Sequence, residues 1–163
     1  MNAAAGDPVV IDDISEHMGA DVPLEKAAVP LGVFFSWCAN LQLIHPDFSA
    51  LHETEVLRLR MRELTPGEFF IRATGGRIST DQLNERGRLF AEAFYPDYPR
   101  AYAESLALSA EHLFDAEDSW DTYDRVAPWL TQRYYAFADA GHKVKGVGGN
   151  GSNAGKHWWQ VWR

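Results

Sequence analysis

The chain has 163 residues, of which 46% are hydrophobic and 13% aromatic, a composition typical of one globular domain that needs no disulfide or structural metal. Its 23 acidic and 15 basic residues give a formal net charge of −8. This charge repels nucleic-acid phosphates and anionic membranes, so we expect no nucleic-acid or membrane partner and favour a basic protein partner.

The sequence also indicates where the protein acts. Cys38 is the single cysteine, so no intrachain disulfide can form, as is usual in a reducing compartment. The first residues carry neither the basic nor the apolar part of a secretory signal, and no stretch approaches the roughly 18 apolar residues of a membrane span. We therefore expect a cytoplasmic protein.

Changes in composition divide the chain into four parts. Residues 1–8 read as a disordered lead and residues 9–140 as a single helical domain. Residues 141–155 form a glycine-rich linker, and residues 156–163 a tail with three tryptophans. The expected fold is all-α, a compact bundle of about five to seven helices with a short extended segment near residues 9–11.

The first strong helical pattern runs over residues 30–44. Proline suits the first position of a helix, so we expect the helix to begin at Pro30. Its apolar residues surround nearly the whole circumference, which is typical of a central helix. A second helix is expected over residues 48–64, although residues 57–62 alternate apolar and basic side chains as a strand would.

Two helices are marked by their capping residues. Thr65, followed by Pro66 and Glu68, forms a capping box that begins one helix, and Gly75 ends it. Ser79 or Thr80 is expected to cap the next helix. The buried face of that helix contains a glycine that would permit another helix to approach closely. Its residues are Leu83, Gly87, Phe90 and Phe94. A further helix is predicted over residues 100–110.

The densest signal lies in residues 115–137. An apolar series spaced three and four residues apart predicts one buried helix face. The series is Trp120, Tyr123, Ala127, Leu130, Tyr134 and Phe137. Pro128 predicts a kink or a restart, because it cannot donate a hydrogen bond to the preceding turn. Five acids begin the stretch, and we predict that they form an outward, partner-binding surface. They are Asp115, Glu117, Asp118, Asp121 and Asp124.

A second acidic group, near the N-terminus, is the other candidate site. Asp12, Asp13 and Glu16 lie close to His17, so they are the second prediction for partner binding. Asp12, Asp13 and His17 could instead serve a metal-dependent or hydrolytic enzyme, since carboxylates beside an imidazole can bind a cation or support a general base. The simpler interpretation is that these acids cap a helix or pair with arginines.

Sequence motifs of enzymes are otherwise weak. There is no HExxH pair and no GxSxG elbow, and the glycines at 146, 148 and 151 match a dinucleotide fingerprint without the strand and helix that it needs. We therefore expect no catalytic residues, no metal and no cofactor. A third possibility is an assembly module that exchanges its tryptophan-rich tail with a neighbour.

Several of these motifs together resemble one family of small, uncharacterised bacterial proteins. They are the Asp-Asp pair followed by His17 and Gly19, the Trp37-Cys38 helix, the Thr-Pro-Gly-Glu-Phe box, and the later Glu117, Asp118, Trp120, Tyr123 and Asp124. The resemblance covers roughly residues 9–138. The chain departs from it at Ile11, where an aromatic residue is usual, and at Glu16, where tryptophan is usual.

Proteins of this kind look like those found beside secreted polymorphic toxins, so the resemblance implies an immunity role. Together with the charge, it favours a protein that binds and neutralises a basic toxin, such as a nuclease, and that is not an enzyme.

Overall fold

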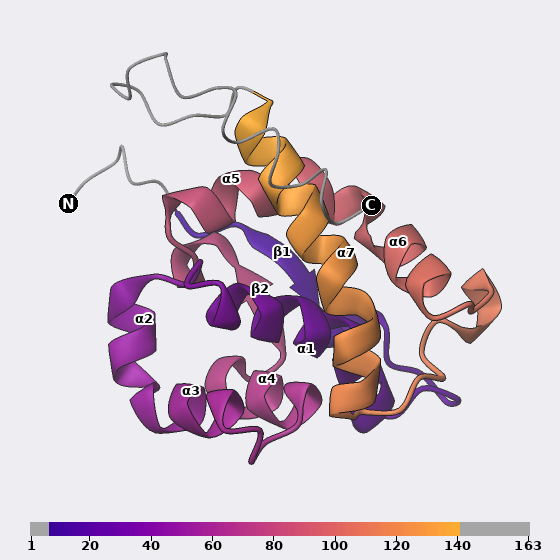
Figure 1. Ribbon diagram of the computed structural model, residues 1–163. Coiled ribbons are helices and arrows are strands. Elements are labelled where there is room, and N and C mark those ends of the chain that lie inside the picture. Colours follow the sequence, from indigo (N-terminus) through magenta and orange to yellow (C-terminus); the bar gives the residue numbers. More distant parts are fainter. Residues whose placement is uncertain (1–6, 141–163) are drawn as a thin grey trace.

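The computed structural model describes residues 7–140 (Figure 1). The predicted linker and tryptophan-rich tail, and all of the predicted lead except its last two residues, lie outside the described residues. Within residues 7–140 the protein is mostly helical, with one small two-stranded sheet, so the expected all-α class is confirmed.

Helix α1, Leu24–Asn40, is the centre of the molecule. Every residue from Ala27 to Ala39 is buried, as the apolar pattern on all sides of this helix predicted. The predicted start was wrong: the helix begins at Leu24, and Pro30 lies inside it. The residues before Pro30 are good helix formers, and the carbonyl of Pro23 accepts the first helical amides.

The chain after α1 forms two short helices where one was expected. Helix α2, Pro46–Leu51, and helix α3, Glu53–Arg60, are separated at His52, whose backbone leaves the helical conformation with φ −114° and ψ 36°. The alternating pattern of residues 57–62 is therefore helical in its first part, with Leu59 buried and Leu57 exposed.

Helix α4, Pro66–Thr74, begins with the capping box that the sequence predicted. The hydroxyl of Thr65 accepts from the amide of Glu68, and the Glu68 carboxylate accepts from the amide of Thr65. Gly75 ends the helix in the left-handed conformation, at φ 75°. The N-terminus of α4 packs tightly on α1, since a Cβ atom at Gly32 would lie 2.7 Å from the carbonyl oxygen of Pro66.

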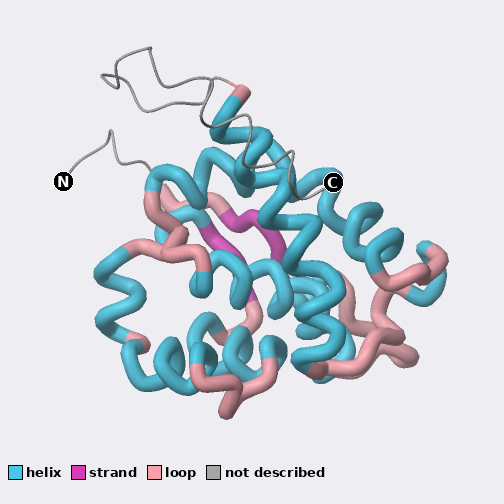
Figure 2. The backbone as a smooth tube through the Cα atoms, in the orientation of Figure 1, coloured by secondary structure: helices cyan, strands magenta, loops and turns pink. Residues whose placement is uncertain are grey.

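Two strands join the N-terminal segment to the chain that follows α4. Strand β1, Val10–Asp13, pairs antiparallel with β2, Arg77–Ser79, and the register places Asp13 opposite Arg77. Figure 2 shows the strands, in magenta, among the helices. Strand β1 extends the predicted segment, whereas β2 was missed because three residues give too short a pattern.

Helices α5, Glu85–Phe94, and α6, Tyr98–Ser105, complete the middle of the chain. Ser79 caps a 3₁₀ turn over Thr80–Gln82, and Asn84 caps α5, so the predicted cap was wrong. Gly87, Phe90 and Phe94 of the predicted face are buried on α5, whereas Leu83 is buried but precedes the helix. The close approach at Gly87 comes from the loop after α1, because a Cβ atom there would lie 2.4 Å from the Leu43 carbonyl oxygen.

Helix α7, Trp120–Asp139, crosses α1 and completes the core (Figure 1). The ring of Tyr134 on α7 packs against two other rings of the core. Its centroid lies 5.9 Å from that of Trp37 in α1 and 5.5 Å from that of Phe90 in α5. The predicted apolar face is buried or packed against the core. The helix runs without a break through Pro128, so the predicted restart does not occur.

Candidate functional site

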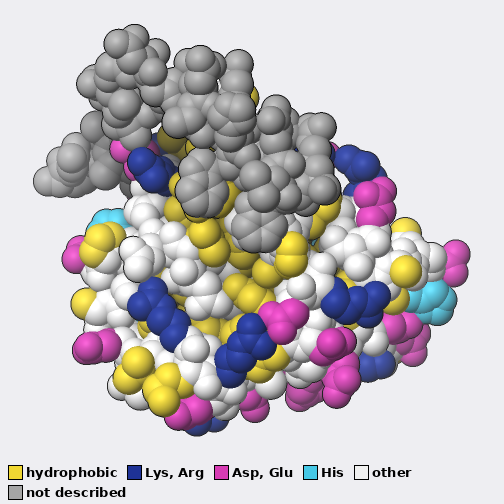
Figure 3. Space-filling view, in the orientation of Figure 1, with side chains coloured by type: hydrophobic (Ala, Val, Ile, Leu, Met, Phe, Trp, Pro, Cys, Tyr) yellow, Lys and Arg dark blue, Asp and Glu magenta, His cyan; other side chains and the backbone are white. Residues whose placement is uncertain are grey.

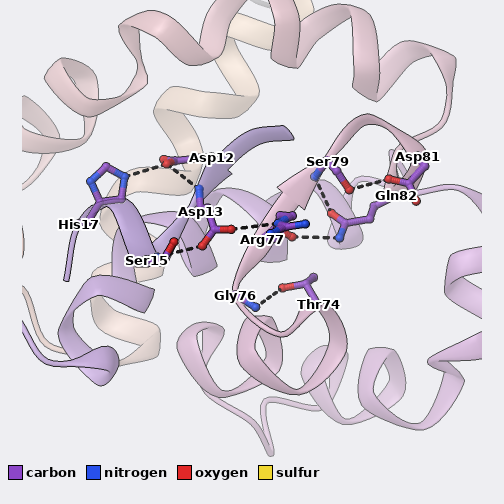
Figure 4. A network of polar contacts seen from close by, with 10 residues as sticks. All are labelled: Asp12, Asp13, Ser15, His17, Thr74, Gly76, Arg77, Ser79, Asp81 and Gln82. Carbon is purple, nitrogen blue, oxygen red and sulfur yellow. Dashed lines mark hydrogen bonds and ion pairs between the residues drawn. The ribbon is translucent and has the colours of Figure 1, made fainter. Parts of the chain in front are cut away.

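The two neighbouring aspartates of β1 point to opposite sides of the strand, because successive side chains in a strand alternate (Figure 4). Asp13 turns towards β2, where its Oδ2 atom lies 2.9 Å from Nε of Arg77. Its Oδ1 atom accepts from the amide of Ser15, and this bond, with that to Arg77, lowers the pKa of Asp13. Asp13 therefore acts as a cap and as a cross-strand ion pair.

Asp12 points inward, and its carboxylate accepts three hydrogen bonds. Its Oδ1 atom lies 2.7 Å from Nε2 of His17 and 2.8 Å from the amide of Asp13, and its Oδ2 atom accepts from the hydroxyl of Tyr95 at 2.5 Å. The side chain of Asp12 is only 12% exposed and that of His17 is 31% exposed. Burial, followed by the charge of Asp12, raises the pKa of Tyr95 well above its usual value, so this hydroxyl keeps its proton.

A carboxylate has only acceptor oxygens, so Asp12 selects the tautomer of His17 in which Nε2 carries the hydrogen between the two groups. The nitrogen Nδ1 then carries a lone pair when the ring is neutral, and in Figure 4 it faces away from Asp12.

Asp12, Asp13 and His17 do not converge on one point. Asp13 faces Arg77, while Asp12 faces His17 and Tyr95. Within residues 7–140, no group of three or more histidines, cysteines or carboxylates is placed to hold a metal ion. The metal-dependent alternative thus lacks its ligand set among the residues that the structure describes.

Asp118, predicted as an outward binding residue, is partly buried at the N-terminus of α4. Its Oδ2 atom accepts from the hydroxyl of Thr65 at 2.6 Å, and its Oδ1 atom accepts from the amide of Gly67 at 2.9 Å. Gly67 leaves the room that this carboxylate needs, since a Cβ atom there would lie 2.6 Å from Oδ2. Asp118 therefore joins the loop before α7 to the first turn of α4, where a negative charge is favourable.

Two more of the predicted acids make hydrogen bonds to basic side chains at the surface. Asp124 makes two hydrogen bonds to Arg62, at 2.8 and 3.0 Å, and the guanidinium of Arg62 lies over the ring of Trp120. Asp115 lies 2.7 Å from Nδ1 of His112. Because α7 begins at Trp120, Asp124 lies on that helix, whereas Asp115 lies in the loop before it.

Three predicted acids are exposed and make no hydrogen bond or ion pair with other residues in the range 7–140. They are Glu16, Glu117 and Asp121. The ring of His17, next to Glu16, packs 5.4 Å from the ring of Phe114, next to Asp115. This contact places the segment that contains Glu16 beside the segment that contains Asp115.

We call Glu16, Asp115, Glu117 and Asp121 the acidic surface. Figure 3 shows acidic side chains gathered at the lower right, over the start of α7 and the loop before it. Sequence analysis found these acids but missed Tyr95 and Phe114, which organise the site. No periodic pattern marked Tyr95 or Phe114, because each acts through a contact with a residue far away in the chain.

The described residues thus define a small helical domain in which a buried Asp–His–Tyr network adjoins an acidic surface. The chain belongs to the family DUF7832, a domain of unknown function, whose sequence model matches residues 10–116. This confirms the expected membership of an uncharacterised family. The match ends before α7, although α7 shares the core with the matched part.

Comparisons with curated proteins and with solved structures give no match. Among the residues that the structure describes, no helix has the length and apolarity required to cross a membrane.

Proposed function

We propose that this protein binds and neutralises a basic partner protein in the bacterial cytoplasm, as an immunity protein does with a toxin such as a nuclease. The observation that carries the proposal is the acidic surface. Glu16, Glu117 and Asp121 are exposed there without a described intramolecular partner, and the His17–Phe114 contact holds the two acidic segments together.

The energetics favour such a surface as a binding site. An exposed carboxylate without an ion-pair partner loses no internal interaction when a basic partner arrives, whereas Asp118 and Asp124 would have to give up the bonds they make. A net charge of −8 also attracts a basic protein at long range. Electrostatic steering of this kind raises association rates to about 10⁸–10⁹ M⁻¹s⁻¹ at low salt.

A pull-down with the product of the adjacent gene tests the proposal. The charge-reversed variant E117K/D121K should associate about tenfold or more slowly with that product at low salt, and the difference should shrink as salt is raised. The matched control is E53K/E85K. It changes the net charge equally and also reverses exposed acids without described partners, each in the first turn of its helix.

Three results would refute the proposal. They are no binding by the wild-type protein, equal rates for E117K/D121K and the wild type, and equal slowing by E117K/D121K and the control. The last result would mean that net charge alone, and not this surface, determines the association.

A further inference from the structure

Helix α3 carries apolar side chains on its solvent side. Leu57 and Met61 lie one helical turn apart, since the amide of Met61 donates to the carbonyl of Leu57, and the two residues are 56% and 62% exposed. Val56 and Leu59 of the same helix are buried, so Leu57 and Met61 face away from the core. Leu51, at the end of the neighbouring helix α2, is exposed as well. Figure 3 shows hydrophobic side chains at the lower left, over α2 and α3. We call Leu57 and Met61 the α3 patch.

The chain that follows α7 has the composition of a ligand for such a patch. Residues 156–163 contain three tryptophans, Trp158, Trp159 and Trp162, between Lys156 and Arg163. Tryptophan offers a large apolar surface, and the thioether of methionine makes favourable contacts with aromatic rings.

The charges of the two parts of the chain are also complementary. Residues 1–140 hold all 23 acidic residues and 11 of the 15 basic ones, which gives them a net charge of −12. Residues 141–163 hold the other four basic residues and no acidic residue. Opposite charges draw this segment towards the domain, and exposed apolar side chains then determine where the tryptophans bind.

The length of the connecting chain matches the distance to the α3 patch. Met61 directly precedes Arg62, whose guanidinium lies 2.8 Å from Asp124 of α7. Since α7 ends at Asp139 and a helix rises 1.5 Å per residue, the patch lies roughly 20–30 Å from the end of α7. Residues 141–158 are rich in glycine, and a glycine-rich chain of that length has a root-mean-square end-to-end distance of about 21–25 Å.

We propose that the tryptophans of residues 156–163 pack on the α3 patch of the same chain. A connecting chain whose mean length matches the span gives an effective concentration on the order of millimolar, far above the concentration of a second copy in a dilute sample. The tail of the same chain is therefore the occupant that the patch meets most often. The inference does not depend on the proposed function, because no residue of the acidic surface lies on α3.

Oxidation of the methionines in the full-length protein tests the contact. Hydrogen peroxide converts an accessible methionine to its sulfoxide, and mass spectrometry of peptides measures the rate at each residue. Met61 should oxidise severalfold faster in the variant W158A/W159A/W162A than in the wild type. Met18, which is 45% exposed, is the internal control and should oxidise at the same rate in both proteins.

A second measurement observes the tryptophans by NMR, through their indole N–H signals. In L57S/M61S the signals of Trp158, Trp159 and Trp162 should shift, because these rings lose their apolar contact. The matched control is V9S/V10S, which also changes two exposed apolar side chains and should leave the three signals in place. All four positions are exposed, so both variants should keep the fold. Tenfold dilution of the wild type should leave the signals unchanged, because the contact lies within one chain.

Three results would overturn the inference. The first is equal oxidation of Met61 with and without the tryptophans. The second is an absence of indole shifts in L57S/M61S, or equal shifts in the control V9S/V10S. The third is a shift of the indole signals on dilution, which would show that the tail binds a second copy. Each of these results leaves the proposed function as it stands, since binding of the adjacent gene product is measured separately.

Discussion

Asp118 is the residue whose replacement tests the structure most directly. In D118N the Oδ1 atom can still accept from the amide of Gly67, but the second oxygen becomes an NH₂ group that cannot accept from the hydroxyl of Thr65. One hydrogen bond to a charged group contributes about 1.5–3 kcal/mol. The charge at the N-terminus of α4 contributes about 0.5–1 kcal/mol more.

We therefore expect D118N to lower the free energy of unfolding by about 2–4 kcal/mol. For a chain of this size, that corresponds to a fall in Tm of roughly 5–12 °C. The measurement is urea unfolding followed by circular dichroism, with thermal unfolding as a second reading. The control is D124N, because the Arg62–Asp124 pair is half exposed, with side chains 49% and 51% exposed. A pair of that kind contributes at most about 1 kcal/mol.

A double-mutant cycle identifies the partner. Combining D118N with Thr65→Val should cost less than the sum of the two single changes, by about 1 kcal/mol, because both remove the same bond. If D118N is as stable as D124N, the bonds of Asp118 do not stabilise the contact between the loop and α4, and an additive cycle would refute the bond between Asp118 and Thr65. Asp118 makes internal hydrogen bonds, so a charge reversal there would weaken partner binding by destabilising the fold. A loss of binding in such a variant is therefore no evidence that Asp118 contacts the partner.

Other positions give independent tests of the core. Gly87→Ala should lower stability by about 1–3 kcal/mol in urea unfolding, because its Cβ atom would meet the carbonyl oxygen of Leu43, and an unchanged midpoint would refute that contact. Three tyrosines have pKa values raised mainly by burial, so they stay protonated in the folded state while the unfolded chain ionises near pH 10. They are Tyr95, Tyr98 and Tyr102. The burial of these protonated hydroxyls contributes fully to the free energy of unfolding below pH 10. Above pH 10 that free energy should fall by up to about 1.4 kcal/mol per pH unit for each tyrosine, and urea unfolding from pH 8 to 11 measures the fall. Burial also raises the pKa of the Cys38 thiol, so a thiol reagent should modify it only after unfolding, and rapid labelling of the native protein would contradict its place in α1.

Local patterns in the sequence predicted the parts of the fold that local interactions form. The capping box at Thr65, the apolar circumference of α1 and the apolar face of α7 were all readable, because each depends on residues within one or two helical turns. Where two local signals competed, the prediction failed. Pro30 suggested a helix start, but the six residues before it form helix equally well, and burial of Ala27 to Ala39 outweighed the missing amide.

The sequence by itself determined which residues are acidic, which faces are apolar and which class of fold can bury them. Only the tertiary structure decided which acids are free. Asp118 meets Gly67 across 51 residues of sequence, and Asp13 meets Arg77 across 64. Nothing in a local pattern distinguishes these carboxylates from Glu117 and Asp121. The physical reason is that an ion pair or a cap needs only a short distance in space, and the packing of α1, α4 and α7 sets that distance.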